Sequence, residues 1–369
     1  MRGATIAGVR ELVFDRMSTP ALLRDLLTTA GPSGYERPAA EVWREAAREF
    51  TADVRGDVVG SSVAVVSGTG PAPLVAIVGH IDEIGLVVTH VDDEGMLWFT
   101  NVGGWDPVIL VGQRVEVHTR DGAIPGVVGK KPIHLLKPDD RKKVPELTDL
   151  HIDVGAKDGD EARALVRVGD VAVIAGEPVD LPNGRVASRA LDNRLGCYVA
   201  LETARRVAAA DGAEADVAAV AVAQEETTFG GSTTTAYSLE PQVAIAVDVT
   251  HATDAPGIAV RELGKHPLGS GAVISRGPIV HPRVFELLHE TAVNEGIPFT
   301  IESHYGRGTH TDADAIHVSR GGVATGLVSI PLRYMHSPVE MCQLDDVEAA
   351  IALLAAFAQR LTAETDFRR

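Results

Sequence analysis

The sequence predicts an α/β fold in which a mostly parallel sheet carries helices on both faces and an all-β domain interrupts the chain. Three observations predict it. Continuous apolar runs, typical of buried strands, alternate with amphipathic helical patterns towards both ends of the chain. Between residues 84 and 182 helical patterns nearly vanish, and short β-type runs alternate with turn residues. The 369 residues suffice for about two domains, since domains hold roughly 100–200 residues.

The part of the chain before residue 84 begins with helices and continues with strands. Ser18-Thr19-Pro20 is typical of a helix start, because a polar cap residue precedes proline. The elements expected here are two helices and two strands, over residues 20–30, 37–50, 62–66 and 74–78. The residues before Met17 carry several charges and lack the continuous apolar run of a signal peptide, and Met17 is an alternative start of translation.

The middle of the chain reads as a compact all-β module of about 100 residues. Six strands are expected in it, over residues 85–91, 96–101, 114–119, 124–128, 150–154 and 171–174. Its visible basic cluster is Arg141-Lys142-Lys143, with Lys137 just upstream. We interpret this cluster as a solvated loop, because runs of like charge are usually exposed.

After Asn183-Gly184 the alternation of helices and strands returns. Helices are expected over residues 194–209, 231–239, 282–294 and 344–361. Strands are expected over residues 217–223, 243–247, 299–303 and 325–330. The predicted organisation is therefore a first part of the α/β domain (1–83), the inserted β domain (84–182) and a second part of the α/β domain (183–369).

The amino-acid composition argues against several classes of function. The chain has 34 Lys and Arg against 51 Asp and Glu, a net charge of −17, which argues against a nucleic-acid surface. No stretch reaches the ~18 uncharged apolar residues of a membrane helix. Two cysteines, Cys197 and Cys342, form neither a disulfide framework nor a cysteine-rich zinc site, which fits a reducing, cytoplasmic location. Any metal must therefore be held mainly by histidines and carboxylates.

Four of the apolar strands run directly into histidines or carboxylates. These residues are His80, the pair Glu225-Glu226, Asp248 and His336. Because ligands of open α/β sheets bind outside the carboxyl ends of the strands, we expect these side chains to converge. Asp192, at the start of the helix expected from 194, is a further candidate, either as a ligand or as a plain helix cap.

Two histidines and three or four carboxylates form a nitrogen and oxygen donor set that suits a divalent transition metal such as Zn²⁺. The set is large enough for two ions if one carboxylate bridges them. Because Glu225 and Glu226 are adjacent, one could bind metal while the other transfers protons. Asp82, two residues beyond His80, is placed to orient the imidazole.

The same residues carry a resemblance to a known family. The matching stretches are GHIDEIG (79–85), GGWD (103–106), KKPIH (130–134), ALDNR (190–194), QEE (224–226), AVD (246–248) and RYMHSPVE (333–340). In these stretches and their order the sequence resembles the dinuclear-metal aminopeptidases, which include glutamyl and deblocking aminopeptidases and tetrahedral, twelve-subunit peptidases. The likeness extends from about Pro20 to Cys342.

The resemblance implies a role for each matching residue. Five residues would hold two divalent metal ions, Zn²⁺ or alternatively Co²⁺: Asp192 as the bridge, His80 and Asp248 at one ion, and Glu226 and His336 at the other. Glu225 would be the general base and Asp82 would hold His80. The inserted β domain would serve assembly into a homo-oligomer, up to a dodecamer, and would shape access to the site.

Two segments depart from the family pattern. Thr227-Thr228-Phe229 follows the Glu-Glu pair where the family has an apolar residue and glycine, and residues 309–315 are more polar than the family pattern. All the positions of the metal ligands and of the base are retained, so the departures bear on substrate preference. His304 and His310 lie near the second segment and are candidates for substrate contact or for ordinary loop roles.

The sequence thus predicts a cytoplasmic, metal-dependent aminopeptidase that hydrolyses N-terminal residues from peptides, with neither nucleic acid nor membrane as a partner. A related dinuclear carboxypeptidase or deacylase is the nearest alternative. A glycoside hydrolase would use two carboxyl groups and no metal, which leaves His80 and His336 unexplained, and 4% aromatic residues give few sugar-stacking surfaces. A non-catalytic assembly protein with a decayed site is the remaining alternative.

Overall fold

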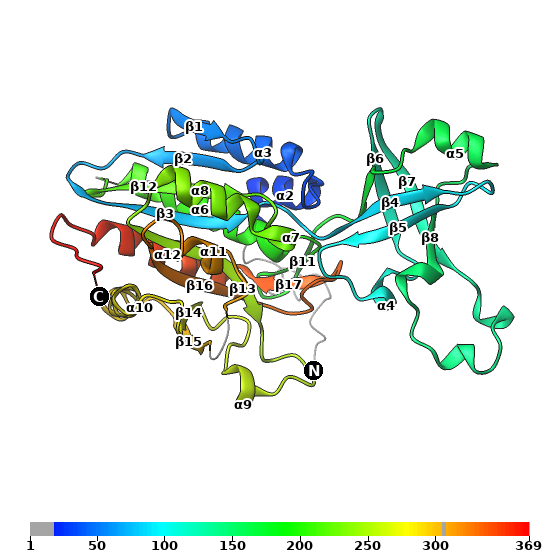
Figure 1. Cartoon of the computed structure of the whole chain (residues 1–369). Coiled ribbons are helices and arrows are strands. Elements are labelled where there is room, and N and C mark those ends of the chain that lie inside the picture. Colours follow the sequence, from blue (N-terminus) through cyan, green and yellow to red (C-terminus); the bar gives the residue numbers. More distant parts are fainter. Residues whose placement is uncertain (1–17, 211, 305–307, 369) are drawn as a thin grey trace, which may run out of the picture.

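The computed structural model describes residues 18–210, 212–304 and 308–368, and it consists of an α/β body beside a smaller β barrel (Figure 1). The predicted fold class is confirmed. The alternative start at Met17 and the residues before it lie outside the described residues. Among the residues that the structure describes, none of the helices is both long enough and apolar enough to cross a membrane.

The α/β body is built on an eight-stranded sheet with the order β1-β2-β12-β3-β13-β16-β14-β15. Its strands are β1 (Asp53–Gly56), β2 (Ser62–Val66), β3 (Ala72–His80), β12 (Ala215–Val222), β13 (Val243–His251), β14 (Ala272–Arg276), β15 (Phe299–Ser303) and β16 (Ala324–Leu332). The four central strands, β12, β3, β13 and β16, are parallel, so their carboxyl ends meet at one edge. The antiparallel pairs lie towards the two sides of the sheet.

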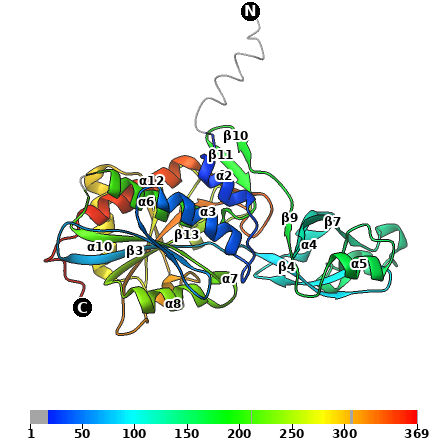
Figure 2. The same cartoon turned by 90° about the horizontal axis from the view of Figure 1, so that it is seen from above.

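Both faces of the sheet are covered, and the alternation of side chains along β3 shows how. Val75 and Ile77 join the larger core, whereas Ala76 and Val78 point to the smaller core on the opposite face. The larger core is covered by α2 (Ala21–Thr28), α3 (Arg37–Arg48), α6 (Leu191–Ala209), α10 (Pro282–Glu295) and α12 (Leu344–Gln359). The smaller core is covered by α8 (Gly230–Leu239) and α11 (Ala313–Ile316). Figure 2 shows α6 and α12 on one side of the sheet and α8 on the other.

The inserted segment forms a closed antiparallel barrel with its own apolar core. Its strands are β4 (Gly85–Val91), β5 (Leu97–Val102), β6 (Arg114–Thr119), β7 (Gly122–Lys130), β8 (Leu150–Asp153) and β9 (Val171–Ile174). The barrel segment also carries two short helices, α4 (Pro107–Leu110) and α5 (Gly159–Leu165). Residues 131–149 leave the barrel between β7 and β8 as a long loop with short 3₁₀ turns (Figure 1).

A small three-stranded sheet joins segments that are far apart in sequence. It consists of β10 (Val179–Leu181), β11 (Arg185–Ser188) and β17 (Glu340–Gln343). β10 lies inside the predicted β-domain segment, yet it pairs with β11 and not with the barrel. β17 follows the loop that carries His336, and β11 precedes α6. Their pairing therefore joins the His336 loop to the residues that lead into α6.

The expected elements differ from the observed ones mainly at their ends. β3 continues to His80, and β13 continues to His251, so that Asp248 lies within the strand and not after it. The polar cap expected before Pro20 does not form, because the Thr19 hydroxyl donates to Asp180 of β10 and no side chain caps α2. The short strands β1, β10, β11, β14 and β17 were not expected from the sequence pattern.

Candidate active site

His80 lies at the centre of the candidate site, as the last residue of β3. Its imidazole is buried, with 1% of the residue exposed. Nε2 lies 3.2 Å from Oδ1 of Asp192, 3.7 Å from Oε2 of Glu225 and 4.0 Å from Oδ1 of Asp248. The ends of β3, β12 and β13 and the start of α6 therefore deliver one histidine and three carboxylates to the same place.

His336 reaches the same cluster from the loop that follows β16. Its Nε2 lies 3.4 Å from Oε1 of Glu226 and 3.5 Å from Oδ2 of Asp192. The backbone N–H of His336 donates to Oε1 of Glu340, over 2.9 Å, which fixes the loop at this residue. The two oxygens of Asp192 thus face two different histidines, since Oδ1 is the atom that lies near His80.

Asp192 is held at an irregular start of α6. Asp192 and Asn193 have non-helical backbone angles, and the peptide between them is cis. The N–H of Asp192 donates to Oε2 of Glu340, and the side chain of Asn193 donates to the carbonyl of Val247 in β13. The sequence left two roles open for Asp192, a helix cap or a ligand. Its side chain makes no capping hydrogen bond, and its carboxylate points to the histidines.

The Glu225-Glu226 pair begins the four-residue helix α7 (Glu225–Thr228), directly after β12. Gln224 adopts a left-handed conformation (φ 61°), which turns the chain so that the two following side chains face His80 and His336. The N–H groups of Glu225 and Glu226 donate to the two carboxylate oxygens of Asp82, over 3.1 and 3.0 Å. Asp82 therefore fixes the backbone that carries both glutamates.

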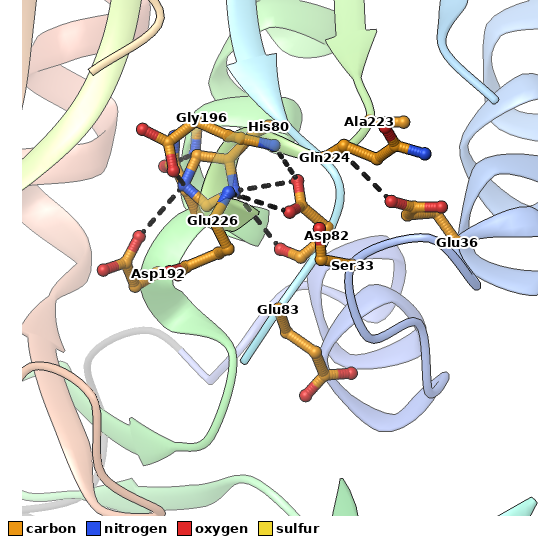
Figure 3. Close-up of polar contacts among 12 residues, drawn as sticks. Ser33, Glu36, His80, Asp82, Glu83, Asp192, Gly196, Ala223, Gln224 and Glu226 are labelled. Atoms are coloured by element: carbon orange, nitrogen blue, oxygen red, sulfur yellow. Dashed lines mark hydrogen bonds and ion pairs between the residues drawn. The ribbon is translucent and has the colours of Figure 1, made fainter. Parts of the chain in front are cut away.

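Asp82 also contacts the histidine ring, as the sequence led us to expect (Figure 3). Its Oδ1 lies 3.4 Å from Nδ1 of His80, and its carbonyl oxygen lies 3.2 Å from the same nitrogen. A proton on Nδ1 has an acceptor here, and Nε2 is the atom that faces the carboxylates of Asp192, Glu225 and Asp248.

The electrostatics of the cluster are dominated by buried negative charge. Burial, with the charge of Asp248 adding to it, raises the pKa of Glu225 to about 10. Burial also raises the pKa of Glu226, and it raises the pKa of Asp248 well above the usual range. Hydrogen bonds to Asp192 and Glu226 raise the pKa of His336 to about 11. The cluster thus favours additional positive charge, supplied by protons or by a cation.

Within the part of the chain that the structure describes, two overlapping groups of side chains have ligand atoms close enough to hold a metal ion. They are His80 with Asp192 and Glu226, and His80 with Glu225 and Asp248, and within each group these atoms lie within 4.8 Å of one another. Imidazole nitrogens and carboxylate oxygens are a donor set that suits Zn²⁺ and its neighbours. The donor set and the buried negative charge both fit a divalent cation.

The residues of the cluster line a pocket of about 760 Å³. His304 and His310, two candidates for substrate contact, both line this pocket, and Thr250, Glu302 and Met335 contribute to its wall. His304 is engaged within the wall, because its Nε2 lies 3.4 Å from Oε2 of Glu302. A peptide end could enter here and reach the cluster, since the pocket is open to solvent.

Several buried acidic residues near the cluster were given no role from the sequence, among them Glu340, Asp312 and Glu36. Glu340 accepts the N–H groups of Asp192 and His336, and its only sequence signal is its place in the RYMHSPVE stretch. Asp312 is 2% exposed, and burial raises its pKa to about 7. Burial also raises the pKa of Glu36 to about 7, and this residue, far from the other site residues in sequence, accepts the N–H of Gln224.

Comparisons with known proteins show a family and a fold that this chain shares. The family model of the M42 glutamyl aminopeptidases matches residues 60–353. The lysyl aminopeptidase of Pyrococcus furiosus is 34% identical over 346 residues, which cover 92% of this chain and 96% of that protein. The solved TET aminopeptidase of Thaumarchaeota archaeon SCGC AB-539-E09 superposes with a TM-score of 0.89 at 34% identity, covering 93% of this chain and 96% of its own. The TET1 peptidase of Pyrococcus horikoshii, described as assembling into a tetrahedron or a large octahedral shell, gives 0.81 at 32% identity, with coverages of 92% and 99%.

Proposed function

The chain belongs to the M42 glutamyl aminopeptidase family and is an aminopeptidase, and we propose that it removes N-terminal residues from peptides at a dinuclear metal centre with Glu225 as the general base. The observation that carries this proposal is the position of Asp192. Its two carboxylate oxygens face His80 and His336 separately, which is the arrangement expected of a carboxylate that bridges two cations.

Each proposed metal ion has its own protein ligands. Asp192 would bridge the two ions, His80 and Asp248 would complete the first, and Glu226 and His336 would complete the second. Nε2 of His80 lies 3.2 Å from Asp192 and 4.0 Å from Asp248, and Nε2 of His336 lies 3.4 Å from Glu226 and 3.5 Å from Asp192. Glu225 lies 3.7 Å from His80 and is kept out of this division because of its proposed role as the base. Zn²⁺ is the proposed metal, and Co²⁺ is the alternative. When bound, the two cations would polarise the scissile carbonyl and lower the pKa of the attacking water.

Glu225 is proposed to move the protons of the reaction. Its carboxylate lies in the cluster but is assigned to neither ion, which leaves it to accept a proton from the attacking water. It would then deliver this proton to the amine that leaves when the peptide bond breaks. Asp82 would keep the geometry fixed, because it contacts the ring of His80 and accepts the backbone N–H of Glu225.

The barrel is proposed to mediate assembly into a homo-oligomer, with a dodecamer as the complete form. Apolar side chains stand exposed on β7 and on the loop that follows it: Val127, Ile133, Leu135 and Val144. Large apolar side chains that are exposed on one segment are typical of a protein interface. The shells formed by the Pyrococcus horikoshii relative support the same proposal. Cys197 and Cys342, both unpaired, are consistent with a proposed cytoplasmic location.

A panel of substrates tests the reaction class. Peptides with a free N-terminus, the same peptides acetylated at the N-terminus, and a soluble glucan are each incubated with the metal-loaded protein. We expect amino acids to be released only from the free peptides and from their N-terminal end. Release from the C-terminal end, cleavage of the acetyl group, or the appearance of reducing sugar would instead support a carboxypeptidase, a deacylase or a glycoside hydrolase.

A further inference from the structure

Two acidic side chains from other segments accept hydrogen bonds from the backbone that carries Glu225 and Glu226. The N–H groups of Glu225 and Glu226 donate to Asp82. The preceding N–H, that of Gln224, donates to Oε1 of Glu36 over 3.1 Å (Figure 3). Three consecutive N–H groups at the start of α7 thus have carboxylate acceptors from two other segments. Unsatisfied N–H groups at a helix start normally need such partners.

The turn has little stability of its own. α7 contains only four residues, and it is bounded by two left-handed residues, Gln224 (φ 61°) and Phe229 (φ 53°). A left-handed conformation costs a non-glycine residue roughly 1–2 kcal/mol, and so short a helix is not stable in isolation. The conformation that directs Glu225 to the cluster therefore depends on contacts from other parts of the molecule.

Glu36 is itself firmly placed. It is 3% exposed, it stands at the start of α3, and its Oε1 also accepts the N–H of Gly34 over 2.6 Å. Its segment is joined to the residues after β3, because the N–H of Gly31 donates to Oε1 of Glu83 and the N–H of Ser33 donates to the carbonyl of Glu83. Glu36 therefore links the end of β3 to the turn after β12.

A second contact joins the same segments at the far end of the turn. The hydroxyl groups of Ser33 and Thr227 lie 2.9 Å apart. Residues 33–36 thus contact the turn both before Glu225 and after Glu226, on the side opposite to the cluster. Thr227 is one of the residues at which the sequence departs from the family pattern, and here it has a structural partner.

We propose that Glu36 is a positioning residue for the general base: by accepting the N–H of Gln224 it fixes the turn that aims Glu225 into the cluster, an inference that rests on the proposed role of Glu225. The contact requires an acceptor oxygen at this position. Glu36→Gln keeps that oxygen, Glu36→Asp withdraws it by one methylene group, and Glu36→Ala removes it. Glu45→Ala is the matched control, since Glu45 lies on the exposed side of the same helix.

Hydrogen exchange tests the contact without relying on catalysis. In the zinc-loaded protein, the amide hydrogen of Gln224 is expected to exchange about tenfold faster in Glu36→Ala and Glu36→Asp than in the wild type. Glu36→Gln and Glu45→Ala should stay within about threefold of the wild type. Unchanged exchange in both Glu36→Ala and Glu36→Asp overturns the proposal, whatever the activity. If Glu36→Ala does not fold, Glu36→Asp against Glu36→Gln makes the same comparison.

Kinetics test the consequence for the reaction. We expect Glu36→Ala and Glu36→Asp to lower kcat about 10- to 100-fold with KM within about twofold and with the zinc content unchanged. Glu36→Gln should restore kcat. A kcat that falls equally in Glu36→Gln and Glu36→Ala would overturn the proposal, because charge and not the acceptor would then matter. A wild type that releases no amino acids counts against the proposed function, and the exchange comparison still decides whether Glu36 fixes the turn.

Discussion

His336 provides the sharpest test at the scale of a single residue, because it is assigned to only one of the two proposed ions. Its ring contacts Glu226 and Asp192, while Asp248 and His80 lie on the other side of Asp192. We expect His336→Ala to lower the zinc content from about two ions to about one per chain, since the ligands of the first ion stay in place. Elemental analysis of the dialysed protein measures this content.

The matched control for this substitution is His310→Ala. His310 lines the same pocket and is exposed, whereas Nε2 of His336 lies 3.4 Å from Glu226 and 3.5 Å from Asp192. The His310→Ala substitution should leave the zinc content of the protein unchanged. A His336→Ala protein that binds as much zinc as the wild type would show that the division of ligands is wrong.

The residues of the cluster were predictable from the sequence for one physical reason. The carboxyl ends of parallel strands meet at one edge, so His80, Asp248 and the residues after β12 converge whatever their separation along the chain. This rule does not predict the positions of Glu340 and Glu36. Glu340 contributes through backbone N–H groups of the His336 loop, and Glu36 contributes from the start of α3. Their positions depend on how loops pack, which no periodicity of the sequence records.

At the scale of elements, the placement of Asp192 depends on a very close approach of α6 to β3. A Cβ atom on Gly79 would lie 2.3 Å from the carbonyl carbon of Gly196, in the backbone of the helix. Gly79→Ala must therefore displace α6, which carries Asp192, from the strand that carries His80. We expect a loss of more than about 2 kcal/mol in the free energy of unfolding, together with a loss of zinc. Chemical denaturation and elemental analysis measure the two effects.

Gly176→Ala is the control for this substitution, since a Cβ atom there meets nothing within 4 Å. It should change stability by less than about 0.5 kcal/mol. If Gly79→Ala has the stability and zinc content of the Gly176→Ala control, the close approach does not place Asp192.

The start of α12 is predicted to make stability depend on pH. Asp346 accepts the N–H groups of Gly269 and Gly271, and burial raises its pKa from 3.8 to about 6. A raised folded-state pKa means that the native protein binds this proton more tightly than the unfolded chain. The contribution to stability is therefore largest at low pH and is lost as the pH rises towards and through 6.

Between pH 4 and pH 7 this loss amounts to about 2 kcal/mol. Asp346→Asn cannot ionise, so we expect the difference in unfolding free energy between the wild type and this variant to change by about that amount over the same range. Asp345→Asn, at the exposed neighbouring position, removes only a smaller cause of the raised pKa of Asp346 and should keep most of the wild-type change. Urea denaturation at pH 4 and pH 7 measures the differences, and parallel curves for wild type and Asp346→Asn would refute the assignment.

The elements with a marked apolar pattern were predicted closely, and several elements without one were missed. β2, β4, β6, β9 and β15 have the expected bounds, because apolar alternation or continuity marks each of them. β1 has an exposed pattern at the edge of the sheet, and β17 is four residues long, so neither carries a clear periodicity. β1 and β17 form by pairing with β2 and β11, and the local sequence does not encode this tertiary pairing.

At the scale of the whole molecule, the barrel with its exposed apolar loop predicts association. We expect light scattering to give a mass that is a multiple of the 38.9 kDa of the single chain, with twelve chains in the complete assembly. Replacing Ile133 and Leu135, which are 57% and 67% exposed, with Ser should lower that mass while leaving the α/β body folded. A strictly monomeric wild type at every concentration would contradict the proposed role of the barrel.

The central claim is that the chain is an aminopeptidase whose reaction requires bound metal and Glu225. The most direct measurement is the rate of amino-acid release from peptides with free N-termini, before chelation, after complete metal removal, and after return of Zn²⁺ or Co²⁺. We predict loss of activity on metal removal, recovery on its return, and a kcat lowered about 10²- to 10⁴-fold in metal-loaded Glu225→Ala. Release at the wild-type rate by the metal-free protein, or by Glu225→Ala, would contradict the claim.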